Sequence, residues 1–324
     1  MDRVAFVIGA SRSGTTVLAE SLSKHPDVHA TEELHFYNLL APLSKGVENA
    51  DTRLASQLLL IEDEGRFFEI KNGAAQHFSI AQPDFLPRTG EAVFPAFLNW
   101  LARREQAKVV VEHTPMNLYY RDQIRRDFEK PVFFLMQRDP RAILASQKNR
   151  WKVGQNGERD IPAADIARVR WSGHPLLQLM LLRSTVRAIA TAAQEDDVVS
   201  VVYEELVQDP VTVLSRLSGR LGIEYDPAMA AVSDRGSSHS SEAGRIGFDP
   251  SRLQGWSETL SGTEIWLIEK LFANSLRQPS TGARPRIGEL VRLFATMPLA
   301  VVMAGYYSSK SYGNLLDAVR KRFF

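Results

Sequence analysis

The chain of 324 residues contains no cysteine. Without thiols it has no disulfide framework, no thiolate-bound metal and no cysteine nucleophile. This absence suits a reducing compartment, so we expect a cytoplasmic protein. A charge excess is also missing, because 39 Lys and Arg face 38 Asp and Glu, a formal net charge of +1. We expect no nucleic acid among its partners.

Long apolar runs are scarce as well. The first residues, MDRVAFVIGASRSG, hold no apolar core of signal-peptide length, so we expect no export signal. The longest apolar stretch, Met297 to Tyr307, is 11 residues long. Since a spanning helix needs about 20 apolar residues, this stretch is predicted to be too short to cross a bilayer. We therefore expect a soluble chain.

The carboxyl-terminal part is basic. Residues 284–324 hold seven Lys or Arg and two Asp or Glu, a balance of +5 within a chain of +1. We treat 1–283 as one domain and 284–324 as a basic, partly apolar segment. Such a segment is compatible with peripheral contact to an anionic membrane or a lipid-linked acceptor. The alternative is a helix that packs on its own domain and keeps a solvated basic side.

Short β-branched runs alternate with longer amphipathic stretches along the sequence. This alternation predicts an α/β fold in which a central parallel sheet lies between two layers of helices. The region from about 39 to 107 is rich in scattered aromatic residues and is predicted to be a helical insertion, and the basic segment a helical tail. The expected strands are Val4–Ile8, Val28–Ala30, Lys108–Glu112, Pro131–Met136 and Val198–Tyr203.

The stretch GASRSGTT, from Gly9 to Thr16, lies between an apolar strand and an amphipathic helix. Gly-x-x-x-x-Gly in this place is typical of a P-loop-type nucleotide-binding fold, in which backbone N–H groups and a helix N-terminus surround an anion. Triphosphate-binding loops continue with lysine, where this chain has Thr15. The cation is instead Arg12, inside the loop. A phosphosulfate, which carries less charge than a triphosphate, fits such a loop without a metal ion. A plain glycine turn with a surface arginine is the alternative.

A second segment, RDPRAILAS, begins where the fourth expected strand ends. Arg138 stands at the end of that strand, and Ser146 lies eight residues later in the next helix. The two side chains are predicted to converge on one phosphate at the carboxyl edge of the sheet. Asp139 is interpreted as a helix cap rather than a magnesium ligand.

Together these segments resemble the sulfotransferases that use 3′-phosphoadenosine 5′-phosphosulfate (PAPS). GASRSGTT is similar to their 5′-phosphosulfate loop and RDPRAILAS to their 3′-phosphate segment. Four further matches follow in the same order, namely HPDVHATEELHFY, EHTP, VVYEELVQDP and SRLQGWSETL. The first of these, HPDVHATEELHFY, contains Glu33 and is similar to the glutamate-bearing loop of the heparan-sulfate and other glycan-modifying members. The chain also resembles bacterial members.

The resemblance implies that an acceptor hydroxyl, on a carbohydrate, lipid or small molecule, attacks sulfur in line and that 3′-phosphoadenosine 5′-phosphate (PAP) leaves, with no metal. Arg12 would neutralise the leaving oxygen. The base is Glu33, or else His113 near the histidine of the small-molecule branch. The loop would bind the 5′-phosphate. Arg138, Ser146 and Arg252 would bind the 3′-phosphate, and Tyr203 would support the edge of the nucleotide. The full set of donor-binding residues is Gly9, Ser11, Arg12, Ser13, Gly14, Thr15, Thr16, Arg138, Ser146, Tyr203 and Arg252.

Two other functions compete with this one. A P-loop kinase would use ATP and Mg²⁺, but the lysine after Gly14 is absent and no strand ends in a clear metal-binding aspartate. A catalytically silent nucleotide-binding protein would keep Arg12 and Arg138 and lack a working base.

Overall fold

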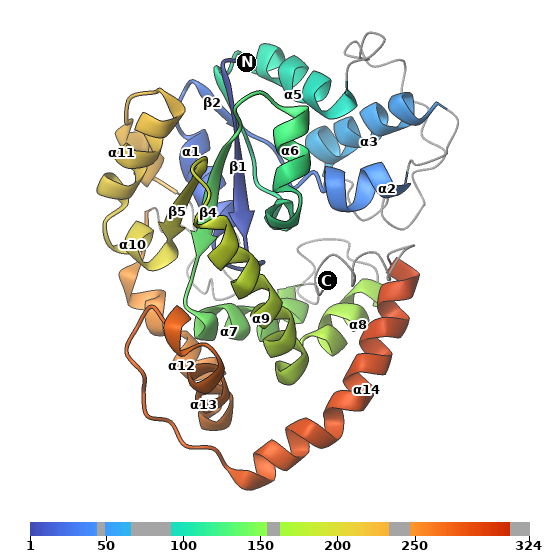
Figure 1. Ribbon diagram of the computed structural model, residues 1–324, viewed down its shortest axis with the longest axis vertical. Coiled ribbons are helices and arrows are strands. Elements are labelled where there is room, and N and C mark those ends of the chain that lie inside the picture. The colour runs from blue at the N-terminus through green and yellow to red at the C-terminus, as the bar shows by residue number, and fades with distance from the viewer. Residues whose placement is uncertain (44–48, 66–91, 154–162, 233–246, 312–324) are drawn as a thin grey trace.

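A parallel five-stranded sheet forms the centre of the protein (Figure 1). The computed structural model describes residues 1–43, 49–65, 92–153, 163–232 and 247–311. The strand order is β2-β3-β1-β4-β5, so the order reverses beside β1. All five predicted strands are confirmed, as β1 (Arg3–Gly9), β2 (Val28–Ala30), β3 (Val109–Glu112), β4 (Val132–Gln137) and β5 (Val198–Val202).

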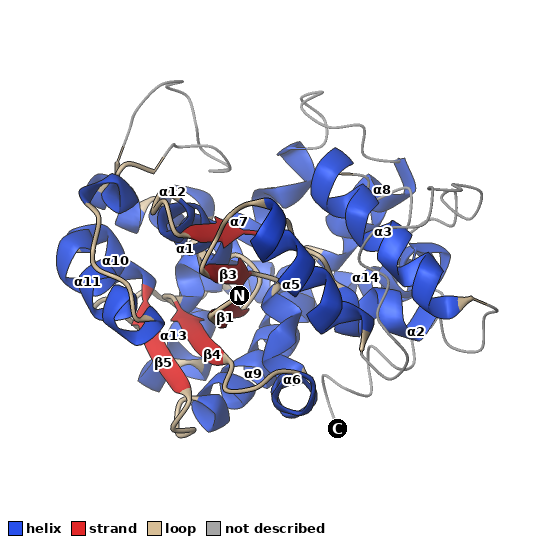
Figure 2. Ribbon diagram, turned by 90° about the horizontal axis from the view of Figure 1, so that it is seen from above, coloured by secondary structure: helices blue, strands red, loops and turns tan. Residues whose placement is uncertain are grey.

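Helices cover both faces of the sheet, as expected for an α/β fold (Figure 2). Because side chains alternate along a strand, Phe6 and Ile8 of β1 lie in one core and Ala5 and Val7 in the other. The first face packs on α3 (Ala50–Glu64), α5 (Val93–Arg104), α6 (Arg121–Asp127) and the end of α9 (Pro175–Ala192). The second packs on α1 (Thr15–Ser23), α10 (Tyr203–Gln208) and α11 (Pro210–Leu221).

The predicted insertion is helical wherever it is described. It begins in the π-helical turn η1 (Phe36–Leu40) and continues through α2 (Ala41–Leu43), α3 and α5, whereas 44–48 and 66–91 lie outside the described residues. Its aromatic residues form a cluster over the sheet, and the rings of Phe36 and Phe94 stack with centroids 4.3 Å apart. The insertion therefore fixes the chain directly after β2, where Glu33 lies.

A third core lies beyond the carboxyl edge of the sheet. It joins α7 (Pro140–Val153) and α9 to α12 (Trp256–Thr259) and α13 (Gly262–Leu271), with Trp256 buried as a packing anchor. The remaining elements are α8 (Ala163–Ser172) and the 3₁₀ turns η3 (Pro115–Tyr119), η4 (Pro227–Ala230), η5 (Pro250–Gln254) and η6 (Ala273–Ser275). In Figure 1 the carboxyl ends of the strands face α7 and α9.

The chain ends its described part in α14 (Ile287–Ser311), a 25-residue helix that packs along α8 and α9 (Figure 1). The predicted helical tail is thus present. The expectation that its apolar stretch is too short to cross a bilayer is wrong in length, because Ile287–Ser308 form a 22-residue span that is sufficient by length and composition alone. The most apolar 18-residue window of this span has a mean hydropathy of 1.7. In the sequence, Thr296 and Arg292 interrupt the apolar run before Met297. The helix nevertheless continues through both residues, so the apolar segment is longer than the uninterrupted run.

Candidate sulfuryl-transfer site

The loop Gly9–Thr16 joins β1 to α1 in a conformation that requires glycine at both ends. Gly14 has φ +101°, and a Cβ atom there would lie 2.4 Å from a ring carbon of Tyr203. At Gly9, with φ +151°, a Cβ atom would lie 2.6 Å from the carbonyl oxygen of Met136. Buried Ser13 closes the turn, since its Oγ donates to the carbonyl oxygen of Ala10 at 2.6 Å. The loop is therefore held tightly against β4 and α10.

Arg12 and Ser146 meet across the carboxyl edge of the sheet. The Nε of Arg12 donates to the Oγ of Ser146 at 2.9 Å, and Nη1 of Arg138 donates to the carbonyl oxygen of Arg12 at 3.0 Å. Arg12 adopts a left-handed backbone conformation, with φ 74°. Such a conformation costs about 1–3 kcal/mol for a residue with a side chain, and strain of this kind gathers at functional sites. Arg12 thus contacts both Arg138 and Ser146, whereas the predicted convergence of these two residues on one phosphate stays a prediction.

Positive charge accumulates at this point. Burial, together with the neighbouring charges of Arg150 and Arg138, lowers the pKa of Arg12 to about 10. Arg12 thus stays protonated at neutral pH, but at a cost that a bound anion would relieve. Sequence analysis missed Arg150. Its signal was the spacing, because residues four apart on α7, Ser146 and Arg150, share one face of the helix.

Tyr203 supports both the loop and Arg138. The guanidinium carbon of Arg138 lies 4.1 Å from the centroid of the Tyr203 ring, a cation–π contact. The same ring covers Gly14. The Nε of Arg138 is buried and has no hydrogen-bond partner among the described atoms. An anion at this point would supply the missing acceptor.

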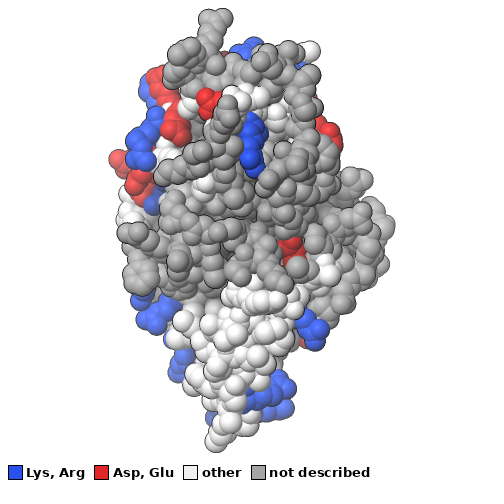
Figure 3. Space-filling view, turned by 90° about the vertical axis from the view of Figure 1, so that its right-hand side faces the viewer, with Lys and Arg blue, Asp and Glu red and all other residues white. Residues whose placement is uncertain are grey.

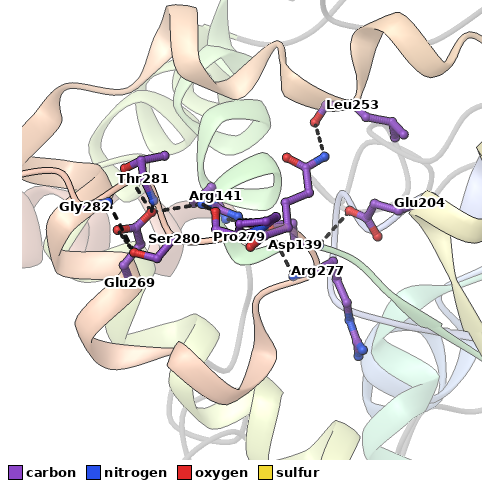
Figure 4. A network of polar contacts seen from close by, with 11 residues as sticks. Asp139, Arg141, Glu204, Leu253, Glu269, Arg277, Pro279, Ser280, Thr281 and Gly282 are labelled. Carbon is purple, nitrogen blue, oxygen red and sulfur yellow. Dashed lines mark hydrogen bonds and ion pairs between the residues drawn. The ribbon is translucent and has the colours of Figure 1, made fainter.

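Asp139 caps α7 as predicted, and both of its carboxylate oxygens accept hydrogen bonds from groups of the protein. Its Oδ1 accepts from the backbone N–H of Arg141 at 2.9 Å, and its Oδ2 accepts from Nη2 of the same arginine at 2.7 Å. The fully buried Arg141 reaches Glu269 at 2.9 Å and stacks 4.3 Å from the ring of Trp256. Glu204 accepts from the backbone N–H of Asp139 at 2.9 Å (Figure 4). This network fixes the turn that carries Arg138.

Glu33 lies in the segment between β2 and η1. Its Oε2 is 3.3 Å from Nε2 of His35, and its side chain is 40% exposed. Burial alone would raise the pKa of Glu33, but a hydrogen bond from His35 and the charges of His35, His113 and Arg150 lower it to about 2. The carboxylate is therefore ionised at neutral pH, as a proton acceptor must be. It lies within electrostatic reach of Arg12 as well.

Glu112, at the end of β3, holds this segment in place. Its fully buried carboxylate accepts from the backbone N–H and the hydroxyl of Thr114 and from the side-chain amide of Asn117. It also accepts from the backbone N–H of Leu34 at 3.4 Å. Thr114 Oγ1 accepts in turn from the backbone N–H of His35 at 3.0 Å. Burial raises the pKa of Glu112.

His113 directly follows Glu112 at the end of β3. It is 6% exposed, and its Nδ1 is buried without a hydrogen-bond partner among the described atoms. Its charge acts on both Glu33 and Glu112. Glu33 is thus within electrostatic reach of the cationic loop and His113 is within reach of Glu33, and the choice between the two candidate bases stays a prediction.

The other predicted donor-binding residues differ in burial and in contacts. Thr15 is buried at the start of α1, whereas Thr16 is exposed. The carbonyl oxygen of Ser11 accepts from the side-chain amide of Gln147 at 3.3 Å. Arg252 belongs to η5, but its side chain lies outside what the structure describes. Its assignment to the 3′-phosphate stays a prediction.

The sequence model of the sulfotransferase family matches residues 5–227. This match covers the loop, both candidate bases and the Arg138 segment. The chain therefore belongs to the sulfotransferase family.

Individual relatives are more distant. The nodulation protein NoeE of Sinorhizobium fredii (strain NBRC 101917 / NGR234) is 27% identical over 236 residues, which make up 69% of this chain and 51% of the relative. The chain thus spans about half the length of this curated relative.

Solved structures of other sulfotransferases are similar at low identity. The sulfotransferase domain of the Synechococcus PCC 7002 olefin synthase aligns with a TM-score of 0.46 and 19% identity, covering 86% of this chain and 96% of that domain. Mouse sulfotransferase SULT7A1, solved in complex with PAP, aligns with a TM-score of 0.41 and 15% identity, covering 90% and 88%. The family assignment rests on the sequence match.

Proposed function

We propose that this sulfotransferase takes its sulfuryl group from PAPS and transfers it to an acceptor hydroxyl by in-line displacement. One observation carries the proposal. Three arginines, Arg12, Arg138 and Arg150, gather beside a glycine loop in which no lysine follows Gly14. A 5′-phosphosulfate and a 3′-phosphate bring negative charge to both ends of this cluster, which suits the donor better than a triphosphate with its metal.

Each group in the site has a defined part in this reaction. The loop amides and Arg12 would hold the 5′-phosphate and neutralise the charge that develops on the leaving oxygen. Arg138 and Ser146 would hold the 3′-phosphate. Glu33 would accept the acceptor's proton, and His113 would hydrogen-bond the acceptor or the transferring oxygens. Donor binding would also raise the pKa of Glu33, because its negative charge offsets the arginines and makes the carboxylate a better base.

The acceptor is proposed to be a hydroxyl on a carbohydrate, lipid or small molecule. The glutamate segment supports a carbohydrate-type hydroxyl, since it resembles that of glycan-modifying members. The cytoplasm is the proposed compartment because the chain has no cysteine.

Nucleotide stabilisation tests the donor. We expect PAP to raise the melting temperature in the presence of EDTA, and ATP with Mg²⁺ to leave it unchanged. Arg138→Ala should remove the PAP effect. The reverse preference would overturn the proposal in favour of a kinase. Transfer of labelled sulfate from PAPS to a panel of hydroxyl acceptors then separates an enzyme from a silent nucleotide-binding protein, which would bind PAP and transfer nothing.

A further inference from the structure

The helix α14 is apolar on all sides over most of its length. Seventeen consecutive residues, from Leu293 to Ser309, include no charged side chain. One side is packed, with Leu293, Ala300 and Ala304 only 5%, 1% and 8% exposed where the helix runs along α8 and α9. A helix that is apolar all round is normally covered all round.

The opposite side of α14 is nevertheless exposed. Val291, Phe294, Leu299 and Val302 are 63%, 60%, 54% and 65% exposed. At 3.6 residues per turn these positions fall within an arc of about 140° on the side away from α8 and α9. Only 17% of the most apolar part of the helix is buried. We call this surface the apolar arc. In Figure 3 the tapering lower part of the molecule is largely free of charge and carries Lys and Arg at its margins.

The charges near the amino end of α14 are sorted by sign. Arg284, Arg286 and Arg292 are exposed. Glu289 is half-buried, and hydrogen bonds from the side chains of Ser261 and Thr263 lower its pKa. Arg292 borders the apolar arc. Positive charge therefore flanks the arc on the solvent side, which complements an anionic lipid surface.

The apolar arc is poorly suited to a protein partner. Interfaces between proteins carry about one hydrogen bond per 100–200 Å². From Phe294 to Gly305 the arc presents only Phe, Ala, Pro, Leu, Val and Gly side chains. The one polar residue in this stretch, Thr296, lies off the arc and donates to the carbonyl oxygen of Arg292 in its own helix at 2.8 Å. Acyl chains require no hydrogen bonds, so the arc suits lipid.

We propose that α14 lies in the surface of an anionic bilayer, with its packed side on α8 and α9 and its apolar arc among the headgroups and upper acyl chains. The helix, about 37 Å long at 1.5 Å per residue, would lie parallel to the membrane. The proposal is independent of the proposed donor. It implies that the transfer site works beside a membrane and meets acceptors there.

Vesicle cosedimentation of the full chain tests this placement. The wild type should sediment with vesicles of phosphatidylcholine mixed with phosphatidylglycerol, and far less with phosphatidylcholine alone. Phe294→Asp with Val302→Asp should weaken binding at least about tenfold, because two exposed apolar side chains leave the lipid. The matched control is Val211→Asp with Leu271→Asp, which adds the same charge at side chains 52% and 50% exposed on α11 and α13. This control should bind like the wild type.

A second variant keeps the apolar arc intact. Arg286→Gln with Arg292→Gln should reduce binding to the anionic vesicles and flatten its dependence on salt. Equal binding by the two aspartate variants would overturn the proposal. The proposal would also be overturned if the wild type bound no vesicles and formed a dimer that Val302→Asp dissociates. In that case a second copy of the chain would cover the apolar arc. Resistance to alkaline carbonate extraction would also overturn it, because the helix would then span the bilayer.

Discussion

The Nε of Arg12 donates a hydrogen bond of 2.9 Å to the Oγ of Ser146, across 134 residues of sequence. This contact joins the glycine loop to α7. It places the guanidinium of the loop against the hydroxyl of the RDPRAILAS segment, so the two segments that we expect to bind the donor are in direct contact.

Removing this hydroxyl should weaken donor binding. We expect Ser146→Ala to lower PAP affinity by about tenfold or more, since a hydrogen bond to a charged group contributes about 1.5–3 kcal/mol. Titration calorimetry measures the change. Ser23→Ala serves as the control, because Ser23 Oγ bonds only within α1, to the carbonyl oxygen of Glu20 at 2.8 Å. Equal affinities for the two variants would argue against Ser146 as a nucleotide ligand.

Glu33 should be required for transfer but not for nucleotide binding. We expect Glu33→Gln to keep the PAP-induced rise in melting temperature and to lose about 100-fold or more in kcat, within the range of general-base catalysis. Because the pKa of Glu33 is lowered to about 2, kcat/KM of the wild type should show no acid limb between about pH 5 and 8. If Glu33→Gln kept its kcat while His113→Ala lost transfer, the base would be the imidazole instead. An acid limb of kcat/KM in that pH range would lead to the same assignment.

Gly14 should tolerate no side chain. We expect Gly14→Ala to abolish stabilisation by PAP, since the added Cβ would meet the Tyr203 ring at 2.4 Å and φ is +101°. A residue strained in this way costs about 1–3 kcal/mol. Gly219→Ala is the matched control, because nothing lies within 4 Å of its Cβ position in α11. That change should be neutral or stabilise by up to about 1 kcal/mol. Thermal unfolding with and without PAP compares the two, and a PAP-responsive Gly14→Ala would contradict the role of the loop.

Thr114 should position Glu33 without touching the donor. Thr114→Val removes the acceptor for the backbone N–H of His35 and the hydroxyl that donates to Glu112. We expect kcat to fall about tenfold or more, because loosened positioning costs rate, while PAP affinity stays unchanged. Steady-state kinetics and calorimetry read the two effects separately. Restored kcat in Thr114→Ser would support a positioning role, and a parallel loss of PAP affinity would reject it.

The ion pair between Arg121 and Glu195 should make the free energy of unfolding depend on pH in the acidic range. A hydrogen bond from Arg121, with a second contribution from Arg125, lowers the pKa of Glu195 from 4.5 to about 2. The stabilisation is therefore complete above pH 4.5 and is lost as pH falls toward about 2. We expect Glu195→Gln to cost about 1–2 kcal/mol at neutral pH, since the pair is partly exposed. Urea unfolding at falling pH should show this difference shrinking, whereas exposed Glu224→Gln should show none.

Much of the fold could be predicted because its signals are local. Short β-branched runs that alternate with longer amphipathic stretches located all five strands to within a residue or two at each end. The glycine spacing located the loop, and the position of Arg138 at the end of a parallel strand placed it at the carboxyl edge of the sheet. The sulfotransferase family then followed from several motifs in sequence, and the family match confirms it.

Contacts made across the sheet could not be predicted in the same way. Arg150 joins the site only because α7 turns its Ser146 face toward the loop, and Glu112 reaches the backbone of Leu34 from another strand. The sequence by itself determined the strands, the loop and the family, since these depend on neighbours along the chain. Only the tertiary structure decided which charges surround Arg12, what holds Glu33, and that α14 leaves an apolar side uncovered, because these depend on how distant segments pack.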